Sequence, residues 1–284
     1  MSGFRTLVDA SSVHEHLNDA AWLIVDCRHS LADLLLGRRL YDEGHLPGAI
    51  FADVEHDLSG AATGHNGRHP LPEREAFAEF LRAHGCNDTT QLVAYDAGAD
   101  MFAARFWFLA RWIGHADVAV LDGGTAAWQA AGFPLVTGAP RSSVRGTLSV
   151  RAQLDGTLDA RQVAALLSSS RCVLVDARAP ERYRGDVEPI DPVAGHIPGA
   201  RNRSFKENYD ERGRMKSAAA LRQEFAAFSH PEHIVHYCGS GISAAANLLA
   251  MLSSGLEGMR LYPGSWSEWC ADPTRPVERG ENSG

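Results

Sequence analysis

Short motifs occur twice in this chain, in the same order and at similar spacing, and this internal repeat is the strongest constraint on its fold. The clearest pair is GHLPGA at residues 44–49 and GHIPGA at residues 195–200, which differ at one position. The paired motifs are residues 26–28 with 176–178, 44–49 with 195–200, 95–96 with 237–238, and 122–128 with 262–269. We therefore predict a tandem duplication, in which two related units fold on the same plan.

Each half alternates short apolar runs with longer amphipathic or apolar segments. The predicted strands are residues 22–25, 92–95, 118–121, 173–175 and 234–237. The predicted helices are residues 9–17, 74–84 and 101–112, a segment that ends at Trp128, and the segment that starts at Ile242. This alternation predicts an α/β protein with two tandem domains, each a mainly parallel central sheet flanked by helices. In such sheets the functional groups gather at the carboxyl ends of the strands.

The stretch at residues 137–156 lies between the two repeats and has Gly, Pro and Arg residues without a clear period. The predicted divisions are a first domain over residues 1–138, a linker over residues 139–156 and a second domain over residues 157–284. The arginines of this stretch are interpreted as solvated linker charge, and they are Arg141, Arg145 and Arg151.

Composition narrows the class of protein. The chain has 284 residues, of which 45% are hydrophobic and 22% charged, as in a soluble globular protein, and its formal net charge is −8. That charge argues against nucleic acid or an anionic membrane as a partner. The sequence has no long apolar run and no apolar signal-peptide core near its start. Five scattered cysteines without a Cys-x-x-Cys pair predict no disulfide framework, metal or cofactor, and fit a reducing cytoplasm.

One cysteine lies in a turn suited to chemistry. The predicted strand at residues 234–237 runs directly into Cys238, two glycines follow within three residues, and a helix-forming run begins at Ile242. A strand-to-helix turn directs backbone N–H groups into one concavity above the positive end of the helix dipole. Such a setting stabilises a thiolate, so Cys238 is predicted to be a nucleophile. The alternative is a small buried cysteine that merely ends a strand.

Taken together, these motifs resemble the tandem rhodanese-like sulfurtransferases, which include thiosulfate sulfurtransferase and 3-mercaptopyruvate sulfurtransferase. The resemblance covers about residues 7–276. It implies that Cys238 takes a sulfane sulfur as a persulfide and passes it to a thiol or cyanide, with a thioredoxin-like reductant as a further candidate partner. It also implies a silent first domain, because Asp96 stands at the matching cysteine position. The loop residues expected to bind persulfide and substrate are Gly239, Ser240, Gly241, Ile242 and Ser243.

Several other residues follow from the resemblance. Arg182 matches the substrate-binding arginine of the family, and a planar guanidinium suits bidentate capture of a carboxylate or thiosulfonate. Arg178 has a twin, Arg28, in the silent half, which favours a structural ion pair over substrate contact. Arg68 and His69 have no twin; the family places such a segment at the cleft between its domains, so substrate contact and a plain loop both stay open.

The remaining candidates are interpreted as structural. His45 and His196 are duplicated, and Trp266 and Trp269 are expected to pack beneath the active loop. The cysteines outside that loop are expected to be inert, and they are Cys27, Cys86, Cys172 and Cys270.

Two further functions share parts of this pattern. Protein-tyrosine phosphatases use Cys-x5-Arg, but Ala244 stands where the arginine belongs, which argues against phosphatase activity. A noncatalytic sulfur-carrier or interaction module stays open. Thiosulfate-preferring members carry two basic residues after the cysteine, and their absence here favours 3-mercaptopyruvate as donor. Against that, residues 188–191 (EPID) lack the second arginine of many mercaptopyruvate enzymes, so thiosulfate remains the alternative.

Overall fold

The computed structural model describes residues 3–99, 101–140, 144–167, 172–228 and 233–281. Arg141, named above as linker charge, lies outside the described residues. The chain divides into two compact units. Unit 1 comprises residues 1–60, 71–154 and 209–215, and unit 2 comprises residues 61–70, 155–208 and 216–284. The segment at residues 61–70 therefore packs within unit 2, although it comes from the first half of the sequence.

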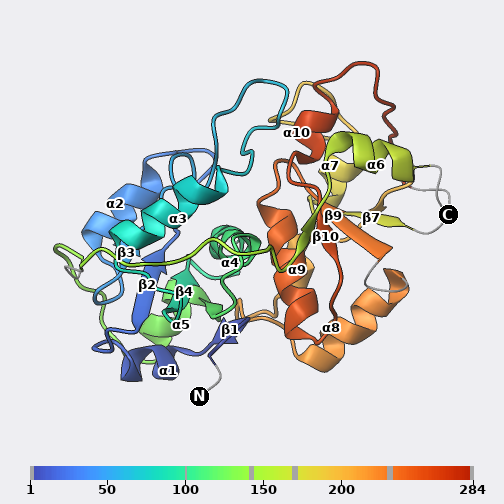
Figure 1. Cartoon of the computed structure of the whole chain (residues 1–284). Coiled ribbons are helices and arrows are strands. Elements are labelled where there is room, and N and C mark those ends of the chain that lie inside the picture. The colour runs from blue at the N-terminus through green and yellow to red at the C-terminus, as the bar shows by residue number, and fades with distance from the viewer. Residues whose placement is uncertain (1–2, 100, 141–143, 168–171, 229–232, 282–284) are drawn as a thin grey trace. The chain divides into compact units, whose positions relative to one another are not determined.

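Unit 1 is built around a parallel sheet with the strand order β1-β5-β4-β2-β3. Its strands are β1 (Leu7–Val8), β2 (Trp22–Asp26), β3 (Ile50–Phe51), β4 (Gln91–Tyr95) and β5 (Val118–Leu121). Its helices are α1 (Ala10–Glu15), α2 (Leu36–Glu43), α3 (Arg74–Ala83), α4 (Phe102–Trp112) and α5 (Gly124–Ala130). Helices α1 and α5 contribute Val13 and Trp128 to one core, while α3 and α4 meet through Phe77 and Phe106 on the other side of the sheet (Figure 1).

Unit 2 repeats this plan with the strand order β6-β10-β9-β7-β8. Its strands are β6 (Gly156–Thr157), β7 (Val173–Asp176), β8 (Arg201–Asn202), β9 (Ile234–Tyr237) and β10 (Arg260–Leu261). Its helices are α6 (Ala160–Leu166), α7 (Pro180–Arg184), η1 (Phe205–Asn208), α8 (Ala218–Phe225), η2 (Ala226–Phe228), α9 (Ser243–Ser253) and α10 (Ser265–Trp269). Helices α8 and α9 cover one face of the sheet, and α6, α7 and α10 cover the other (Figure 1).

The predicted fold class is confirmed, because each unit is a five-stranded parallel sheet between layers of helices. The central strands β4 and β9 are buried along their whole length, as expected when helices cover both faces. The sequence prediction missed β1, β3, β6, β8 and β10. These strands have two residues each, so they carry no periodic pattern that could reveal them.

The duplicated arginines hold the loop that follows a central strand. Arg178 donates to both carboxylate oxygens of Asp176 and to the carbonyl of Gly195, and its side chain is 1% exposed. In unit 1, Arg28 makes the same bonds to Asp26 and to the carbonyl of Gly44. Because both units use this pair alike, the structural interpretation of Arg178 is confirmed.

The duplicated histidines are structural too. His196 stacks on Tyr183 with ring centroids 3.8 Å apart, and its Nδ1 lies 2.8 Å from the carbonyl oxygen of that tyrosine. His45 has the same relation to Tyr41. Trp266 is fully buried beneath the loop that carries Cys238, as expected.

The described part of the linker follows the surface of unit 1. Arg145 is ion-paired with Glu79, and Arg151 is ion-paired with Asp88 at 2.6 Å. Both side chains remain more than half exposed, which agrees with the expectation of solvated linker charge and adds two surface ion pairs to it. Exposed ion pairs of this kind add little to the free energy of unfolding.

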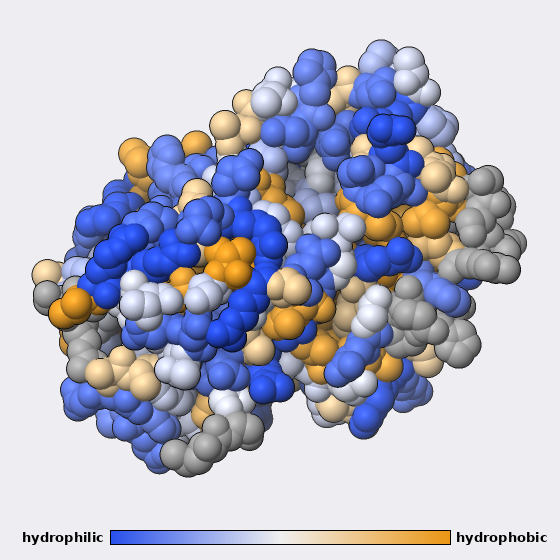
Figure 2. Space-filling model, viewed as in Figure 1, coloured by the Kyte–Doolittle hydropathy of each residue, from blue (hydrophilic) through white to orange (hydrophobic). Residues whose placement is uncertain are grey.

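On the face shown in Figure 2, hydrophilic residues predominate and hydrophobic ones form small separate groups. The longest described helices, α4 and α9, have 11 residues each. A bilayer crossing takes about 20 apolar residues, and no described helix is long and apolar enough to make one.

Candidate active site

Cys238 follows β9 directly, at the carboxyl end of the central strand of unit 2. Its side chain is buried, with the residue 2% exposed, and the backbone N–H of Gly241 donates to its Sγ at 3.1 Å. Ile242 and Ser243, both buried, lead into α9. The thiol therefore lies in a turn between a strand and a helix start, where a backbone donor already faces the sulfur.

A second loop, residues 262–267, holds the cysteine turn in place through hydrogen bonds. The backbone N–H groups of Trp266 and Ser267 donate to the carbonyls of Cys238 and Gly239, each at 2.9 Å. The Oγ of Ser265 accepts from the N–H of Cys238 at 3.1 Å and donates to the carbonyl of Tyr262 at 2.9 Å. Ser265 has φ 56, a left-handed conformation that is unfavourable for serine. The site thus holds local strain that the surrounding hydrogen bonds maintain.

Gly241 is the residue of this turn least able to accept a side chain. Its φ is +79, and a β-carbon there would overlap the carbonyl oxygen of Pro263. We expect Gly241→Ala to lower the free energy of unfolding by about 1–3 kcal/mol and to reduce activity severely, because the cysteine turn must shift. Thermal unfolding and turnover would measure both effects.

Gly255→Ala is the matched control, because Gly255 has φ +80 with no atom near the position of a β-carbon. This variant should lower the free energy of unfolding by about 1–2 kcal/mol, which is the cost of placing alanine in a left-handed backbone conformation, and it should leave turnover unchanged. Equal losses of activity in both variants would contradict a specific requirement at Gly241.

Two guanidinium groups converge on the cysteine loop. A β-carbon placed on Gly239 would lie 3.0 Å from Nη2 of Arg68 and 3.5 Å from Nη1 of Arg182. The sequence has no cation between Cys238 and Ser243; Arg182 was expected to supply one, and substrate contact by Arg68 was left open. The structure adds Arg68, which reaches the loop from residues 61–70.

Two carboxylates balance these arginines. Arg182 donates to Glu188 at 2.7 Å and to Asp191 at 3.3 Å, and Arg68 is ion-paired with Asp191. Burial raises the pKa of Asp191, against the opposing influence of Arg68. Burial would also raise the pKa of Glu188, but hydrogen bonds from Arg182 and from backbone N–H groups outweigh it and lower that pKa. The stretch at residues 188–191, which lacks a second arginine, thus contributes two carboxylates to an ion-pair cluster.

His69 lies beside the hydroxyl of the cysteine loop. Its Nδ1 is 2.7 Å from the Oγ of Ser240, and both residues are buried. The backbone N–H of Arg68 donates to the Oγ of Ser267 at 3.1 Å, which ties the segment to the second loop. Of the two interpretations left open for Arg68 and His69, the structure favours a place at the site over a plain loop.

Asp96 occupies the position in unit 1 that matches Cys238, and its carboxylate already accepts hydrogen bonds from nearby backbone N–H groups. The carboxylate of Asp96 accepts from the backbone N–H groups of Gly98 and Ala103, each at 3.0 Å. Asp96 is 5% exposed, and burial raises its pKa. This carboxylate takes up N–H groups of the kind that a sulfur anion would need.

The cysteines outside the loop lie in settings that disfavour a thiolate. Burial raises the pKa of Cys86 to about 12 and that of Cys270 to about 11. Burial also raises the pKa of Cys27 and Cys172. Since the thiolate is the reactive form, these four are poor nucleophiles.

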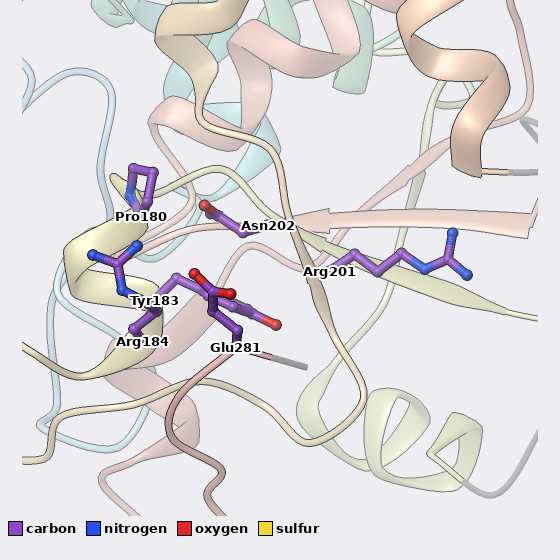
Figure 3. A pocket seen from close by; sticks show the side chains of 6 residues that line it. All are labelled: Pro180, Tyr183, Arg184, Arg201, Asn202 and Glu281. Atoms are coloured by element: carbon purple, nitrogen blue, oxygen red, sulfur yellow. The ribbon is translucent and has the colours of Figure 1, made fainter. Parts of the chain in front are cut away.

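Unit 2 also has a pocket away from the cysteine loop. This pocket, of about 270 Å³, lies between α7 and β8. Figure 3 shows that the guanidinium of Arg201 points away from Tyr183, so it does not join Arg184 and Glu281 around this pocket. Across the described parts of the chain, no group of three or more His, Cys, Asp or Glu residues has an arrangement that could hold a metal ion.

Comparison with known proteins places these features in context. A family model described as "Rhodanese-like domain" matches residues 9–131 and 159–272. The chain is 45% identical to a "Probable 3-mercaptopyruvate sulfurtransferase" of Pseudomonas aeruginosa over 281 residues, which covers 97% of this chain and 98% of that protein. It is 39% identical to a "Putative thiosulfate sulfurtransferase SseB" of Mycobacterium tuberculosis, with 86% of each chain covered.

Solved structures give the same picture. The crystal structure of SseA from Escherichia coli, described as a 3-mercaptopyruvate sulfotransferase, matches with a TM-score of 0.79 at 30% identity and covers 93% of this chain and 99% of that one. The 3-mercaptopyruvate sulfurtransferase from Leishmania major matches with a TM-score of 0.81 at 30% identity, covering 93% of this chain and 74% of that one.

Proposed function

This chain belongs to the rhodanese-like family and is a sulfurtransferase, and we propose that it takes sulfur from 3-mercaptopyruvate and carries it as a persulfide on Cys238. The observation that carries the proposal is the meeting of Arg68 and Arg182 beside Gly239, next to the nucleophile. The names of similar proteins support the same donor. Side-by-side turnover of 3-mercaptopyruvate and thiosulfate, with cyanide and a thiol as acceptors, tests it.

The proposed reaction balances without a cofactor. The Cys238 thiolate attacks the donor sulfur, so an S–S bond forms and the donor C–S bond breaks. The electron pair of the C–S bond passes to carbon and gives the enolate of pyruvate, which gains a proton to complete its methyl group. The donor thiol supplies an equivalent proton, since the persulfide is left as an anion. A thiol or cyanide then takes the outer sulfur, and Cys238 returns to a thiolate.

The loop residues have separate roles in this scheme. The N–H of Gly241 already points at the sulfur of Cys238, and the turn through Ile242 and Ser243 places the start of α9 nearby. These fixed dipoles stabilise the developing persulfide anion. Arg182 and Arg68 bind the donor carboxylate or carbonyl, with Gly239 leaving room for both guanidiniums.

The pair of His69 and Ser240 is proposed to deliver the proton that the leaving enolate needs. Transfer by a positioned acid contributes about 10²–10⁴-fold to a rate. We therefore expect His69→Gln to lower kcat with 3-mercaptopyruvate by about 10²-fold. Thiosulfate should be less affected, because sulfite leaves with the electron pair and needs no proton at that step. Steady-state kinetics with both donors would measure the difference.

His65→Gln serves as the control for His69→Gln, because His65 is exposed in the same segment. It should leave both donors unchanged. An equal loss for both donors in His69→Gln would speak against proton delivery and for a purely structural bond to Ser240.

We also propose that the two domains divide the work as the sequence suggests, with a first domain over residues 1–138 that has no nucleophile of its own, a linker over residues 139–156 and a catalytic second domain over residues 157–284. Arg68 and His69 belong to the first domain in sequence but serve the site of the second, since residues 61–70 pack within unit 2. The buried, hydrogen-bonded Asp96 supports a silent first domain. Mass analysis after reaction with the donor should find the added sulfur on Cys238.

The free cysteines support a proposal about the compartment in which the protein works. All five cysteines are free, which fits a reducing compartment such as the cytoplasm. A thioredoxin-like dithiol is the proposed biological acceptor, since it can take the outer sulfur and release it as sulfide while forming its own disulfide. Turnover with small donors would separate this enzyme from a noncatalytic sulfur carrier, and a higher kcat/KM for thiosulfate would favour the alternative donor.

A further inference from the structure

One carboxylate bridges the two arginines of the candidate site. Asp191 contacts Arg68 through Oδ1 and Arg182 through Oδ2, the latter at 3.3 Å, and its side chain is 3% exposed. The backbone N–H of Asp191 donates to Glu188 at 3.1 Å, so the bridge is held in place by its own loop. The spacing of the two guanidiniums is therefore set by a buried side chain and not by the donor.

The charges of this cluster cancel. Three guanidiniums, those of Arg68, Arg178 and Arg182, are paired with three carboxylates. The carboxylates are those of Asp176, Glu188 and Asp191. Arg68 and Arg182 remain 29% and 18% exposed, whereas the Arg178 side chain is 1% exposed, so the first two are the ones accessible to a donor. A donor therefore enters a cluster without net charge, so every negative charge it brings is only partly compensated and a dianion is disfavoured more than a monoanion.

We propose that Asp191 is a specificity-determining positioning residue, which spaces Arg68 and Arg182 and removes enough positive charge for the site to favour monoanionic α-keto thiol donors over dianions such as thiosulfate. This inference rests on the proposed function. Asp191 acts through the two arginines and does not touch the reacting sulfur.

Asp191→Asn tests the charge, because it keeps the shape of the side chain and removes its negative charge. The ratio of kcat/KM for thiosulfate to kcat/KM for 3-mercaptopyruvate should rise about tenfold or more, since a carboxylate this close to a bound dianion is strongly repulsive. The rise should shrink as salt is added, because screening weakens charge effects at a partly exposed site. Asp191→Glu keeps the charge and should hold the ratio near that of the unmodified enzyme.

Two further variants distinguish a charge effect of Asp191 from a general loss of folded structure. Asp186→Asn changes an acid of the same loop that pairs with Arg184 at 2.7 Å, and it should leave the ratio unchanged. The double variant Arg68→Gln with Asp191→Asn removes one charge of each sign. It should return the ratio toward that of the unmodified enzyme, and it remains informative if Asp191→Asn alone folds poorly.

The outcomes are distinct. A ratio that stays constant in folded Asp191→Asn, or rises equally in the charge-balanced double variant, overturns the role of Asp191 and leaves the sulfurtransferase proposal standing. Two other results would instead count against the proposed function itself. One is that the unmodified enzyme turns over neither donor, and the other is that Cys238→Ser keeps its turnover.

Discussion

Cys238→Ser is expected to abolish sulfur transfer with either donor, with a loss of about 10⁴-fold or more, because no other group in the loop can form the persulfide. A serine oxygen is a poor nucleophile toward sulfur and cannot hold a transferable sulfane sulfur. The bonds from the N–H groups of Trp266 and Ser267 go to backbone carbonyls of the cysteine turn. The sulfur accepts one bond, from the N–H of Gly241, and a serine oxygen can accept in its place, so the variant should keep its fold. Turnover assays and intact-protein mass after donor treatment would measure the loss.

Cys270→Ser is the appropriate control for this experiment. Cys270 also lies in unit 2, follows α10 directly and is 8% exposed, yet burial raises its pKa to about 11. The variant should retain near-normal turnover and should still gain the mass of one sulfur atom. Substantial turnover in Cys238→Ser, or loss of the added sulfur only in Cys270→Ser, would show that the nucleophile has been misassigned.

Arg182→Ala is expected to lower kcat/KM for both donors by about 10²–10³-fold. An attraction between unit charges about 4 Å apart is about 4 kcal/mol at an effective dielectric near 20, and about 1.4 kcal/mol corresponds to a factor of ten. The loss should appear mainly in KM, since the guanidinium binds the donor before the C–S bond breaks as well as during that step. Removal also leaves Glu188 and Asp191 with one partner fewer, so the melting temperature should fall as well.

Arg184→Ala provides the comparison for Arg182→Ala. Arg184 lies in the same helix, α7, but its partner is the exposed Asp186. It should change kcat/KM by less than about twofold, as expected for an exposed ion pair. Arg182→Lys adds a second test, because lysine keeps the charge but not the bidentate fork, and it should recover only part of the activity. Full activity in Arg182→Ala would mean that Arg68 alone binds the donor.

The two units share one fold and differ at the loop to which the proposed chemistry is assigned. Asp26 with Arg28, and Asp176 with Arg178, brace the strand ends alike. The difference lies in the residue that follows the central strand, which is Asp96 in unit 1 and Cys238 in unit 2. A carboxylate that accepts the loop N–H groups of its own backbone leaves them unavailable to a substrate anion.

Local patterns in the sequence determined the architecture and pointed to the proposed nucleophile. The apolar run of β9, the glycines after Cys238 and the helix-forming residues beyond them are adjacent in the chain, so their geometry follows from short-range sterics and hydrogen bonding. The repeat added a second source of information, since a residue present in both halves, such as Arg178, is best explained by structure.

Only the tertiary structure decided which residues complete the proposed donor site. Arg68 and His69 lie in a segment without helix or strand, so no periodic pattern places them. Their positions come from contacts with Asp191, Ser240 and Ser267, which are more than a hundred residues away along the chain. The same holds for the acids near Arg182: their charge is visible in the sequence, but whether it repels a donor or holds an arginine in place depends on side chains that folding brings within about 3 Å, the ordinary distance of a hydrogen bond.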